Sequence, residues 1–252
     1  MKQNKVGLII ISTGKYDRFI QPLVNSMDKH FFAGDEFDVY LLSDNEYLIS
    51  YPERVSHQRF HVPHLPFPLP TLNRYKWITQ YSDSITAKNL FYMDVDMLFV
   101  GSVGDEIRPN GKQLVATYHP GFYMNDGWGD NDTHPLSRAY LHPKMRTHYY
   151  AGGFQGGERK TYLEACGIMA MRIEEDFEIA RTIDFTKNNG ILARWHDESH
   201  WNCYLKYGMS TFKSLTPEYC MAEQIELRKK WKIDNLIPKI IALEKDHNKL
   251  RT

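Results

Sequence analysis

The sequence predicts an α/β fold with a parallel, doubly wound sheet, because strand patterns alternate with helical patterns in its N-terminal part. A run of apolar, mostly β-branched side chains at residues 6–11 ends in a Ser-Thr-Gly turn, and residues 18–30 follow with the apolar spacing of a helix. Residues 37–42 and 90–94 repeat the strand pattern, and residues 72–81 between them have the helical one. In an open sheet of this kind, nucleotides bind at the carboxyl ends of the strands.

The rest of the chain is predicted to contribute loops, a further strand and further helices. Residues 61–70 contain four prolines, which exclude a helix and a central strand and indicate a stiff loop. Residues 120–148 show no periodicity and are predicted to form a long surface excursion. Residues 164–172 have a buried-strand pattern, and the helical patterns lie at residues 174–187 and 198–207.

Composition indicates a small-molecule substrate rather than a nucleic acid or a membrane surface. The 31 Lys and Arg residues balance the 31 Asp and Glu residues, so no overall field attracts the chain to a polyanion. The apolar run at residues 6–11 is too short to span a membrane and lacks the cleavage site of a signal peptide. The 3 cysteines form no C-x-x-C pair, which argues against a disulfide framework and a zinc cluster. We therefore expect a soluble, cytoplasmic protein without an integral membrane segment.

Two carboxylates interrupt an apolar segment that otherwise has the pattern of one buried strand. Residues 90–93 are apolar, Asp94 and Asp96 follow, and residues 97–100 are apolar again. Ionised carboxylates are costly to bury unless a cation or a counter-charge lies close by. Their spacing places both side chains on one face of an extended chain, where Mg²⁺ or Mn²⁺ takes oxygen ligands and bridges phosphates. The alternative is a pair of exposed carboxylates at a strand end, without a function.

Two further segments combine side chains that are suited to a sugar. Residues 149–157 hold four glycines and three aromatic residues, so a ligand can approach the backbone beside a stacking wall, although a tight turn explains the same pattern. Residues 195–200, WHDESH, contain a ring, two imidazoles and two carboxylates. His196 and His200 share a helix face, but the segment lacks the H-E-x-x-H order of a zinc protease. The segment is either the acid-rich start of a helix or the source of a carboxylate that faces an anomeric carbon.

Several motifs occur along most of the chain in a fixed order. They are TGKY at residues 13–16, KHFFAG at 29–34, MDVD at 93–96, YYAGGFQGG at 149–157, WHDESH at 195–200 and PEYC at 217–220. In these motifs the chain resembles the family 6 glycosyltransferases, which include the histo-blood-group A and B transferases, the α-1,3-galactosyltransferase and bacterial homologues. Many of the bacterial homologues have N-x-N and work without metal, whereas this chain keeps both acids.

The resemblance implies a GT-A fold, in which a Rossmann-like nucleotide-binding sheet is joined to a mixed-sheet, acceptor-binding half. Residues 1–252 would form a single glycosyltransferase domain. Within it, residues 1–100 would mainly bind UDP, residues 101–222 would mainly bind the donor sugar and the acceptor, and residues 223–252 would form a tail that closes over UDP. The implied activity is transfer of GalNAc or Gal from a UDP-sugar to the 3-OH of a galactoside-type oligosaccharide acceptor, as an α-1,3 linkage with retention.

The resemblance also assigns roles to individual residues. Asp94 and Asp96 would hold Mn²⁺, or Mg²⁺, against the diphosphate, and Glu198 would form a covalent intermediate or stabilise an ion pair. The residues that would bind the nucleotide are Ile11, Ser12, Thr13, Tyr16, Val95, Lys245, His247 and Arg251. The residues that would bind the donor sugar and the acceptor are Arg74, His119, Ala151, Gly152, Gly153, Trp195, His196 and Asp197.

The same motifs lead to expectations about the donor, the metal and the source. Small residues at Ala151 and Gly153 leave room for an N-acetyl group, so we expect UDP-GalNAc rather than UDP-Gal as the donor. Because both acids are kept, we expect dependence on Mn²⁺. The absence of an anchor and a stem suggests a bacterial or phage source. Two other functions fit a similar scaffold, namely a catalytically silent sugar- or nucleotide-binding module, and a nucleotidyltransferase that consumes a sugar phosphate and UTP.

Overall fold

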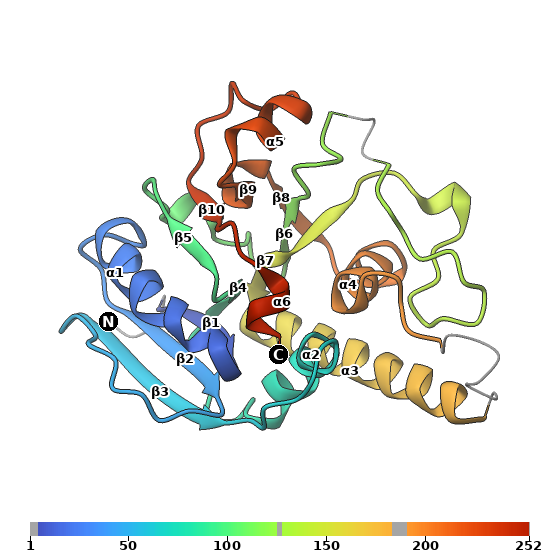
Figure 1. Ribbon diagram of the computed structural model, residues 1–252, viewed down its shortest axis with the longest axis horizontal. Coiled ribbons are helices and arrows are strands. Elements are labelled where there is room, and N and C mark those ends of the chain that lie inside the picture. Colours follow the sequence, from blue (N-terminus) through green and yellow to red (C-terminus); the bar gives the residue numbers. More distant parts are fainter. Residues whose placement is uncertain (1–4, 125–127, 183–190, 252) are drawn as a thin grey trace.

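The computed structural model describes residues 5–124, 128–182 and 191–251 (Figure 1). Its strands are β1 (Val6–Ser12), β2 (Phe37–Ser43), β3 (Val55–His61), β4 (Asn89–Asp94), β5 (Met97–Phe99), β6 (Leu114–Tyr118), β7 (Tyr150–Glu158), β8 (Phe212–Leu215), β9 (Met221–Ala222) and β10 (Ile240–Ala242). Its α-helices are α1 (Ile20–His30), α2 (Leu69–Gln80), α3 (Arg159–Thr182), α4 (His196–Tyr207), α5 (Ile225–Lys230) and α6 (His247–Leu250).

The strands β3, β2, β1 and β4, in this order, form the parallel part of the main sheet, and the parallel pairing of β2, β1 and β4 is the one that the sequence predicts. β1 pairs with β2 from Val6 opposite Phe37, and with β4 from Val6 opposite Asn89. This register places Ile11, near the end of β1, opposite Asp94 at the end of β4. The carboxyl ends of the two strands therefore meet at one edge of the sheet.

The sheet changes direction after β4, so the prediction of a parallel sheet is correct only for its N-terminal half. β7 runs antiparallel to β4 on one side and to β6 on the other, and β8 pairs parallel with β6 at the edge. In the described part of the chain, the main sheet has the order β3-β2-β1-β4-β7-β6-β8, and a smaller sheet has the order β5-β10-β9. The physical reason is that the connection from β6 to β7 contains no crossover helix in its described part, and parallel neighbours need such a crossover.

The ladder between β6 and β7 contains a bulge. Ala116 lies opposite Gln155, but the next residue, Thr117, lies opposite Ala151. The ladder between β4 and β7 ends with Met93 opposite Phe154. Neither ladder therefore includes the glycines at residues 152–153, and their backbone polar groups are available to side chains.

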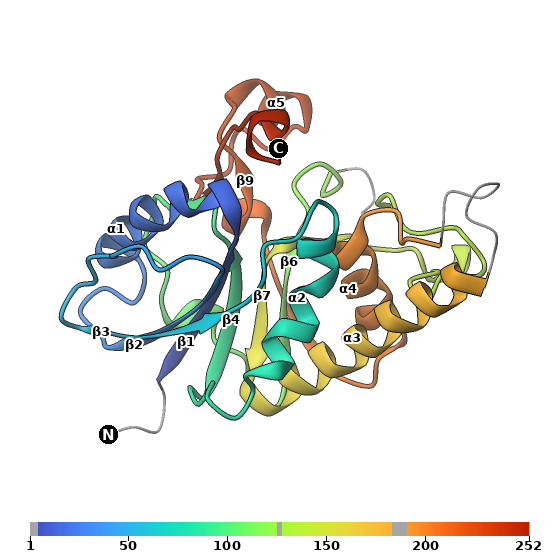
Figure 2. The same cartoon turned by 60° about the horizontal axis from the view of Figure 1, so that its bottom comes forward.

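Helices cover both faces of the main sheet (Figure 2). Leu8 and Ile10 of β1 belong to the core that includes Leu23 of α1. Ile9, between them, points to the opposite face and belongs to the core that includes Ile78 of α2 and residues of α3 and α4. Because both faces are buried, β1 is apolar throughout instead of alternating, which is why its pattern is easy to recognise.

Helix α3 contains residues 164–172, so the prediction of a strand in this segment is wrong. Tyr162, Ala165 and Met169 are buried, and their spacing of three and four residues is that of one helix face. The strand pattern arose because the segment is apolar on more than one side. The helix predicted at residues 174–187 is the continuation of α3, and the part of that range beyond the end of α3 lies outside the described residues.

Other predictions need correction at their bounds. Strand β3 was not predicted, because it lies at the sheet edge and, after Val55, its side chains are mostly exposed and polar. Helix α2 begins at Leu69, inside the segment predicted as a loop, since proline is tolerated in the first turn of a helix. The helix predicted at residues 18–30 begins as the 3₁₀ turn Gly14–Phe19 and continues as α1.

The helix predicted at residues 198–207 is α4, which begins two residues earlier.

The long excursion predicted at residues 120–148 is confirmed in its described part, which contains no strand and no helix beyond the 3₁₀ turn Pro143–Met145. The described residues also contain no helix with the length and apolar character needed to cross a membrane.

Candidate active site

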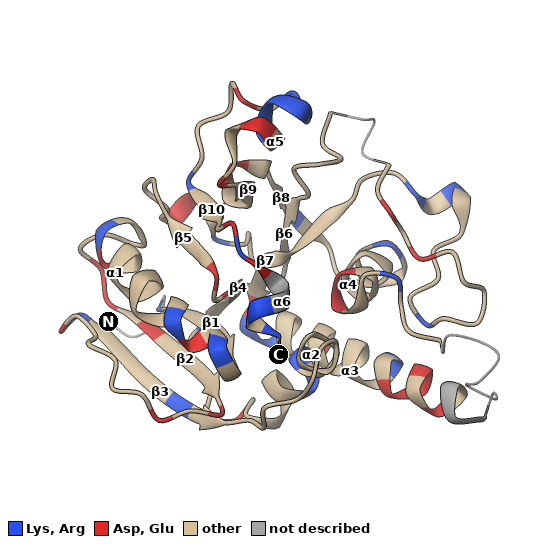
Figure 3. Cartoon of the chain, in the orientation of Figure 1, with Lys and Arg blue, Asp and Glu red and all other residues tan. Residues whose placement is uncertain are grey.

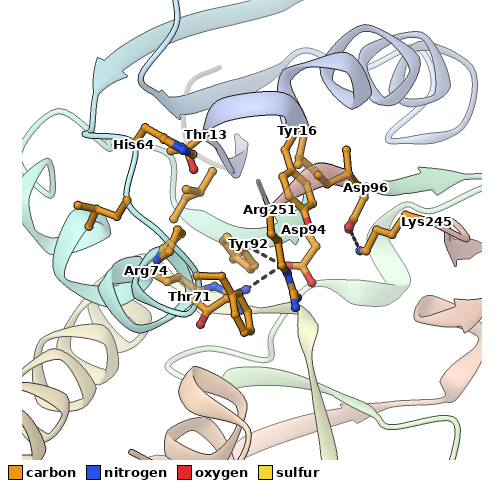
Figure 4. A pocket seen from close by; sticks show the side chains of 16 residues that line it. Thr13, Tyr16, His64, Thr71, Arg74, Tyr92, Asp94, Asp96, Lys245 and Arg251 are labelled. Atoms are coloured by element: carbon orange, nitrogen blue, oxygen red, sulfur yellow. Dashed lines mark hydrogen bonds and ion pairs between the residues drawn. The ribbon is translucent and has the colours of Figure 1, made fainter. Parts of the chain in front are cut away.

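A pocket opens at the edge of the main sheet where β1 and β4 end (Figure 4). Its walls come from the turn after β1, the segment between β3 and α2, helix α2, the end of β4 and the C-terminal tail. Figure 3 shows Lys and Arg residues of that tail near the middle of the molecule, over the strand ends of the sheet. The lining residues are Ile11, Thr13, Tyr16, His64, Leu65, Phe67, Pro70, Thr71, Arg74, Tyr92, Asp94, Val95, Asp96, Lys245, Leu250 and Arg251.

Two side chains hold Asp94, the last residue of β4. Its Oδ1 accepts a hydrogen bond from the Tyr92 hydroxyl over 2.7 Å and one from Arg74 Nη2 over 2.8 Å. The Arg74 guanidinium also lies over the Tyr92 ring, 3.9 Å from its centroid. The Asp94 side chain is still 36% exposed, so its carboxylate faces the pocket that it lines.

Asp96 is almost fully buried, and its Oδ2 contacts the ammonium of Lys245 from the C-terminal tail (Figure 4). Burial lowers the pKa of Lys245, and the nearby charge of Asp94 opposes that shift. The Lys245 ammonium therefore neutralises the Asp96 carboxylate. A carboxylate that pairs with one cation in this position is a suitable ligand for Mg²⁺ or Mn²⁺. Among the described residues, no group of three or more His, Cys, Asp and Glu side chains gathers in metal-binding geometry. A divalent ion held by Asp94 and Asp96 would thus complete its coordination with oxygens of a ligand and of water.

Arg74 connects the end of β4 to helix α4. Its Nη1 lies 2.5 Å from Asp197 Oδ2 and donates to the Gly152 carbonyl over 2.9 Å, while its Nη2 binds Asp94. Burial alone would lower the pKa of Arg74, but the charges of Asp197 and Asp94 hold it well above its usual value. The guanidinium therefore remains a cation between two carboxylates that come from distant parts of the chain.

Glu198 lies in the first turn of α4 and contacts the same glycine as Arg74. Its Oε2 accepts a hydrogen bond from the Gly152 N–H over 2.8 Å. Burial raises the pKa of Glu198 to about 7, and the Gly152 N–H partly opposes this shift. Glu198 is not among the residues that line the pocket, whereas Arg74, its partner at Gly152, is. A carboxyl group whose pKa lies near neutrality is typical of catalytic residues.

Trp195 and His196 come immediately before these acids, at the start of α4. The Trp195 indole N–H donates to Asp130 Oδ2 over 2.9 Å, which ties α4 to the long excursion. His196 has a φ of 50°, and its ring makes an edge contact with Phe67 at a centroid distance of 5.2 Å. Arg251 lies 3.5 Å over the same Phe67 ring. The tail, the segment before α2 and the start of α4 therefore meet at one aromatic side chain.

Comparison with known proteins decides the family of the chain. The family model described as glycosyltransferase family 6 matches residues 1–252. The chain belongs to glycosyltransferase family 6. Its mixed α/β architecture agrees with the GT-A fold that the sequence resemblance predicts.

Curated relatives from vertebrates support this assignment. Histo-blood group ABO system transferase 1 of Rattus norvegicus is 28% identical over 233 residues, which are 89% of this chain and 63% of the relative. Globoside alpha-1,3-N-acetylgalactosaminyltransferase 1 of Gallus gallus is 28% identical over 222 residues, 85% of this chain and 61% of the relative. Alpha-1,3-galactosyltransferase 2 of Homo sapiens is 24% identical over 237 residues, 87% of this chain and 63% of the relative. The chain thus spans 61% to 63% of the length of these three relatives.

In this family 6 chain, most residues predicted to bind the nucleotide line the pocket. These are Ile11, Thr13, Tyr16, Val95, Lys245 and Arg251. Ser12 does not line it, because successive side chains of a strand point to opposite faces. The Ser12 hydroxyl is buried and has no hydrogen-bond partner in the described part of the chain. The side chain of His247 lies outside the described residues.

The small residues of β7 lie where larger side chains would meet the site. A Cβ on Gly153 would lie 3.0 Å from Asp94 Oδ2, and a Cβ on Gly152 would lie 3.2 Å from Asp197 Oδ2. Ala151 is buried beside them. Because Gly152 and Gly153 have no side chains, the carboxylates of Asp197 and Asp94 can lie against them. The Asp94 carboxylate therefore already fills part of the space beside Gly153.

His119 does not line the pocket and lies next to Tyr149, with a centroid distance of 5.7 Å. Its Nδ1 accepts a hydrogen bond from the Gly121 N–H over 3.1 Å, and burial lowers the pKa of His119 to about 4, so the ring is neutral. The Tyr149 hydroxyl is buried without a hydrogen-bond partner among the described residues. Burial, and then the proximity of Glu198, raises the pKa of Tyr149.

The sequence analysis missed several residues of the site. The segment between β3 and α2 contributes His64, Leu65 and Phe67 to the pocket. Their position was hidden because β3 was not predicted; a loop known to follow a parallel strand would have been placed at the same edge as Asp94. Tyr92 was also missed, although it lies two residues before Asp94 on the same face of the strand.

Proposed function

We propose that this chain is a retaining hexosyltransferase that moves GalNAc, or Gal, from a UDP-sugar to the 3-OH of a galactoside-type acceptor, forming an α-1,3 linkage. The observation that carries the proposal is the ion-paired Arg74, which joins Asp94 at the nucleotide end to Asp197 in α4. The next residue is Glu198, so the acid that would face C1 of the hexose lies beside a group tied to the end of β4. A diphosphate and its sugar would thus bind in adjoining sites.

Breaking the bond between C1 and the phosphate oxygen builds negative charge on UDP and positive charge on the sugar ring. Lys245 and Arg251 line the pocket and offset the charge on the departing diphosphate. Asp94 and Asp96 would hold Mn²⁺ or Mg²⁺, which would supply Lewis-acid stabilisation of the same diphosphate. The Lys245 ammonium at Asp96 supports a cation at this position.

Glu198 serves the other end of the breaking bond. Its carboxylate, oriented by the Gly152 N–H, either bonds to C1 or stabilises the cationic ring as an ion pair. In both cases the acceptor oxygen reaches C1 on the face that UDP leaves, which accounts for retention. The acceptor proton passes to the departing phosphate oxygen, whose basicity rises as its bond to C1 breaks.

The two other functions considered from sequence are less well supported. A silent binding module gains nothing from a half-buried acid whose pKa burial raises to about 7, as at Glu198. A nucleotidyltransferase would also use paired acids, but the names of these relatives describe glycosyl transfer. The choice of GalNAc, the requirement for Mn²⁺, and the cytoplasmic, bacterial or phage setting stay predictions.

The decisive experiment incubates the protein and Mn²⁺ with a panel of UDP-sugars and an array of galactoside acceptors. We expect UDP release with UDP-GalNAc, and a new α-1,3 linkage in the NMR spectrum of the product. A Glu198→Gln variant should bind UDP with unchanged affinity in calorimetry and lose turnover. Full turnover by this variant would overturn the proposed role of the acid, and UDP-sugar formation from UTP and a sugar phosphate would identify a nucleotidyltransferase.

A further inference from the structure

We infer that Gln155 of β7 is a positioning residue for the transfer reaction: its side-chain amide holds the Gly152 carbonyl and so aligns the Gly152 N–H that binds Glu198. The inference rests on the proposed role of Glu198. Gln155 neither lines the pocket nor contacts Glu198 directly.

The first observation is that Gln155 places an amide group inside the core of the sheet. The side chain is fully buried, 0% exposed, although its neighbours in this core are mostly apolar. A buried amide is strongly unfavourable unless its polar atoms have partners. Nε2 donates to the Gly152 carbonyl over 3.0 Å. The amide also lies 3.3 Å from the Tyr75 hydroxyl, which either donates its one proton to Oε1 or accepts from Nε2 and keeps that proton for the Asp197 carbonyl. Because a carbonyl can only accept, Gly152 fixes which end of the amide points toward it.

The second observation is the bulge, which explains why Gly152 needs a side-chain partner. The ladders that β7 forms with β4 and with β6 both omit Gly152, so no residue of a neighbouring strand orients its carbonyl. The carbonyl instead accepts from Arg74 Nη1 over 2.9 Å and from Gln155 Nε2 over 3.0 Å. Two donors on one acceptor restrict the rotation of a glycine that otherwise has the freest backbone of any residue. The N–H of that glycine donates to Glu198, so its direction depends on both donors.

The third observation is a second connection to the same acid through α2. The Tyr75 hydroxyl lies 3.3 Å from the Gln155 amide and 3.4 Å from the backbone carbonyl of Asp197. Asp197 and Glu198 share the first turn of α4. A buried polar chain therefore runs from the bulge in β7 to the start of the helix that carries the acid, and Gln155 lies at its centre.

The test replaces the amide with an apolar side chain of similar length, in Gln155→Met. We expect kcat with UDP-GalNAc and a galactoside acceptor to fall about three- to tenfold, the effect of one misaligned hydrogen bond. KM for the donor should change less than about twofold, because the nucleotide contacts are untouched. In the wild type, the hydrogen bond from the Gly152 N–H lowers the pKa of Glu198. A weaker bond in the variant should raise that pKa, so the acidic limb of the pH profile of kcat should move to higher pH.

The matched control is Phe154→Leu, which alters an equally buried neighbour on the same strand whose ring packs on Phe91. This variant should melt at a lower temperature and keep the wild-type kcat and pH profile. If Gln155→Met does not fold, Gln155→Glu is used for the test instead. Glutamate has the same shape as glutamine but turns an oxygen toward the Gly152 carbonyl. This variant should lose more activity than Phe154→Leu.

Wild-type kcat and pH profile in the Gln155 variants would overturn the inference, and so would equal losses in Phe154→Leu. Failure of the proposed function is distinguishable, because it would be seen as full turnover in Glu198→Gln, whatever the Gln155 variants do.

Discussion

Arg74 of α2 and Asp94 of β4 are joined by an ion pair of 2.8 Å, and the same guanidinium lies 2.5 Å from Asp197 of α4. The three residues come from three elements on the same side of the sheet edge, and Arg74 is 5% exposed. One buried cation is therefore shared by two carboxylates and partly offsets their repulsion of each other and of a diphosphate. The site is held together before a ligand arrives, which is what electrostatic preorganisation requires.

Replacing Arg74 with Lys should damage both activity and stability. A single ammonium cannot contact Asp94, Asp197 and the Gly152 carbonyl at once, so one carboxylate is left without its partner. We expect kcat/KM to fall about a hundredfold and the free energy of unfolding to fall by about 2–4 kcal/mol. Steady-state kinetics and urea unfolding measure the two effects.

Arg54→Lys is the matched control for that variant. Arg54 contacts Asp28 and several backbone carbonyls around α1, including those of Met27 and Phe32, away from the pocket. Its replacement should lower stability and leave kcat/KM unchanged. A comparable loss of activity in both variants would mean that the effect of Arg74→Lys is one of general stability.

Glu198→Gln should stabilise the protein at alkaline pH. Burial raises the pKa of Glu198 to about 7, above its value in the unfolded chain. The folded wild type is therefore favoured below the unfolded pKa and loses stability as the pH rises through the folded one. The amide carries no charge, so the variant should be more stable by about 1–3 kcal/mol near pH 8, with the difference vanishing near pH 4. Urea titrations at both pH values measure the difference.

Glu158→Gln is the control, and it should change the pH dependence of the free energy of unfolding in the opposite direction. Burial tends to raise the pKa of Glu158, but hydrogen bonds from Thr161 and other groups lower it below its usual value. The stability that this carboxylate contributes is present above its unfolded pKa and is lost as the pH falls. Equal pH dependence in the two variants would contradict the assignment of a raised pKa to Glu198.

The parts of the fold that could be predicted from sequence are the strands whose two faces are both buried. The strand at residues 6–11 and the strand that ends at Asp94 are buried on both faces, so an apolar run identified them. The edge strand β3 has mostly exposed, polar side chains and gave no pattern. Helix α3 was divided because its apolar residues cover more than one face, and periodicity over nine residues could not separate a strand from a helix there.

The site was predictable from sequence only in part, because its contacts join distant segments. Asp94 and Asp96 were found from residue chemistry, since charges in an apolar run need an explanation. The contact between Arg74 and the Gly152 carbonyl spans 78 residues and leaves no local pattern. The family resemblance alone points to Arg74, and Gln155 is found in the sequence only as one residue of the YYAGGFQGG motif, without a role of its own. Pairings of this kind need the topology, which places β7 antiparallel beside β4.

Asp130→Ala should affect the acceptor and spare the donor. Asp130 accepts from the Trp195 indole over 2.9 Å and pairs with Arg194 over 2.9 Å, so it holds a ring that is 49% exposed. Releasing that ring should raise KM for the acceptor about tenfold. Hydrolysis of the UDP-sugar without acceptor should stay at the wild-type rate. Asp105→Ala, which breaks an exposed ion pair with Arg108, is the control and should change neither quantity.

Removal of divalent metal should abolish transfer, because Asp94 would then face the diphosphate with only a share of Arg74, and Asp96 with only Lys245. Lys245 compensates Asp96 in the structure, but one ammonium cannot also neutralise Asp94 and both phosphates. We expect excess chelator to reduce transfer at least about a hundredfold, and Mn²⁺ in excess of the chelator to restore it. Asp96→Asn should bind Mn²⁺ more weakly in a titration followed by electron paramagnetic resonance, whereas Asp28→Asn, far from the pocket, should bind it as the wild type does. Full turnover in the presence of chelator would show that Lys245 and the other basic residues of the tail carry the charge of UDP without a metal ion.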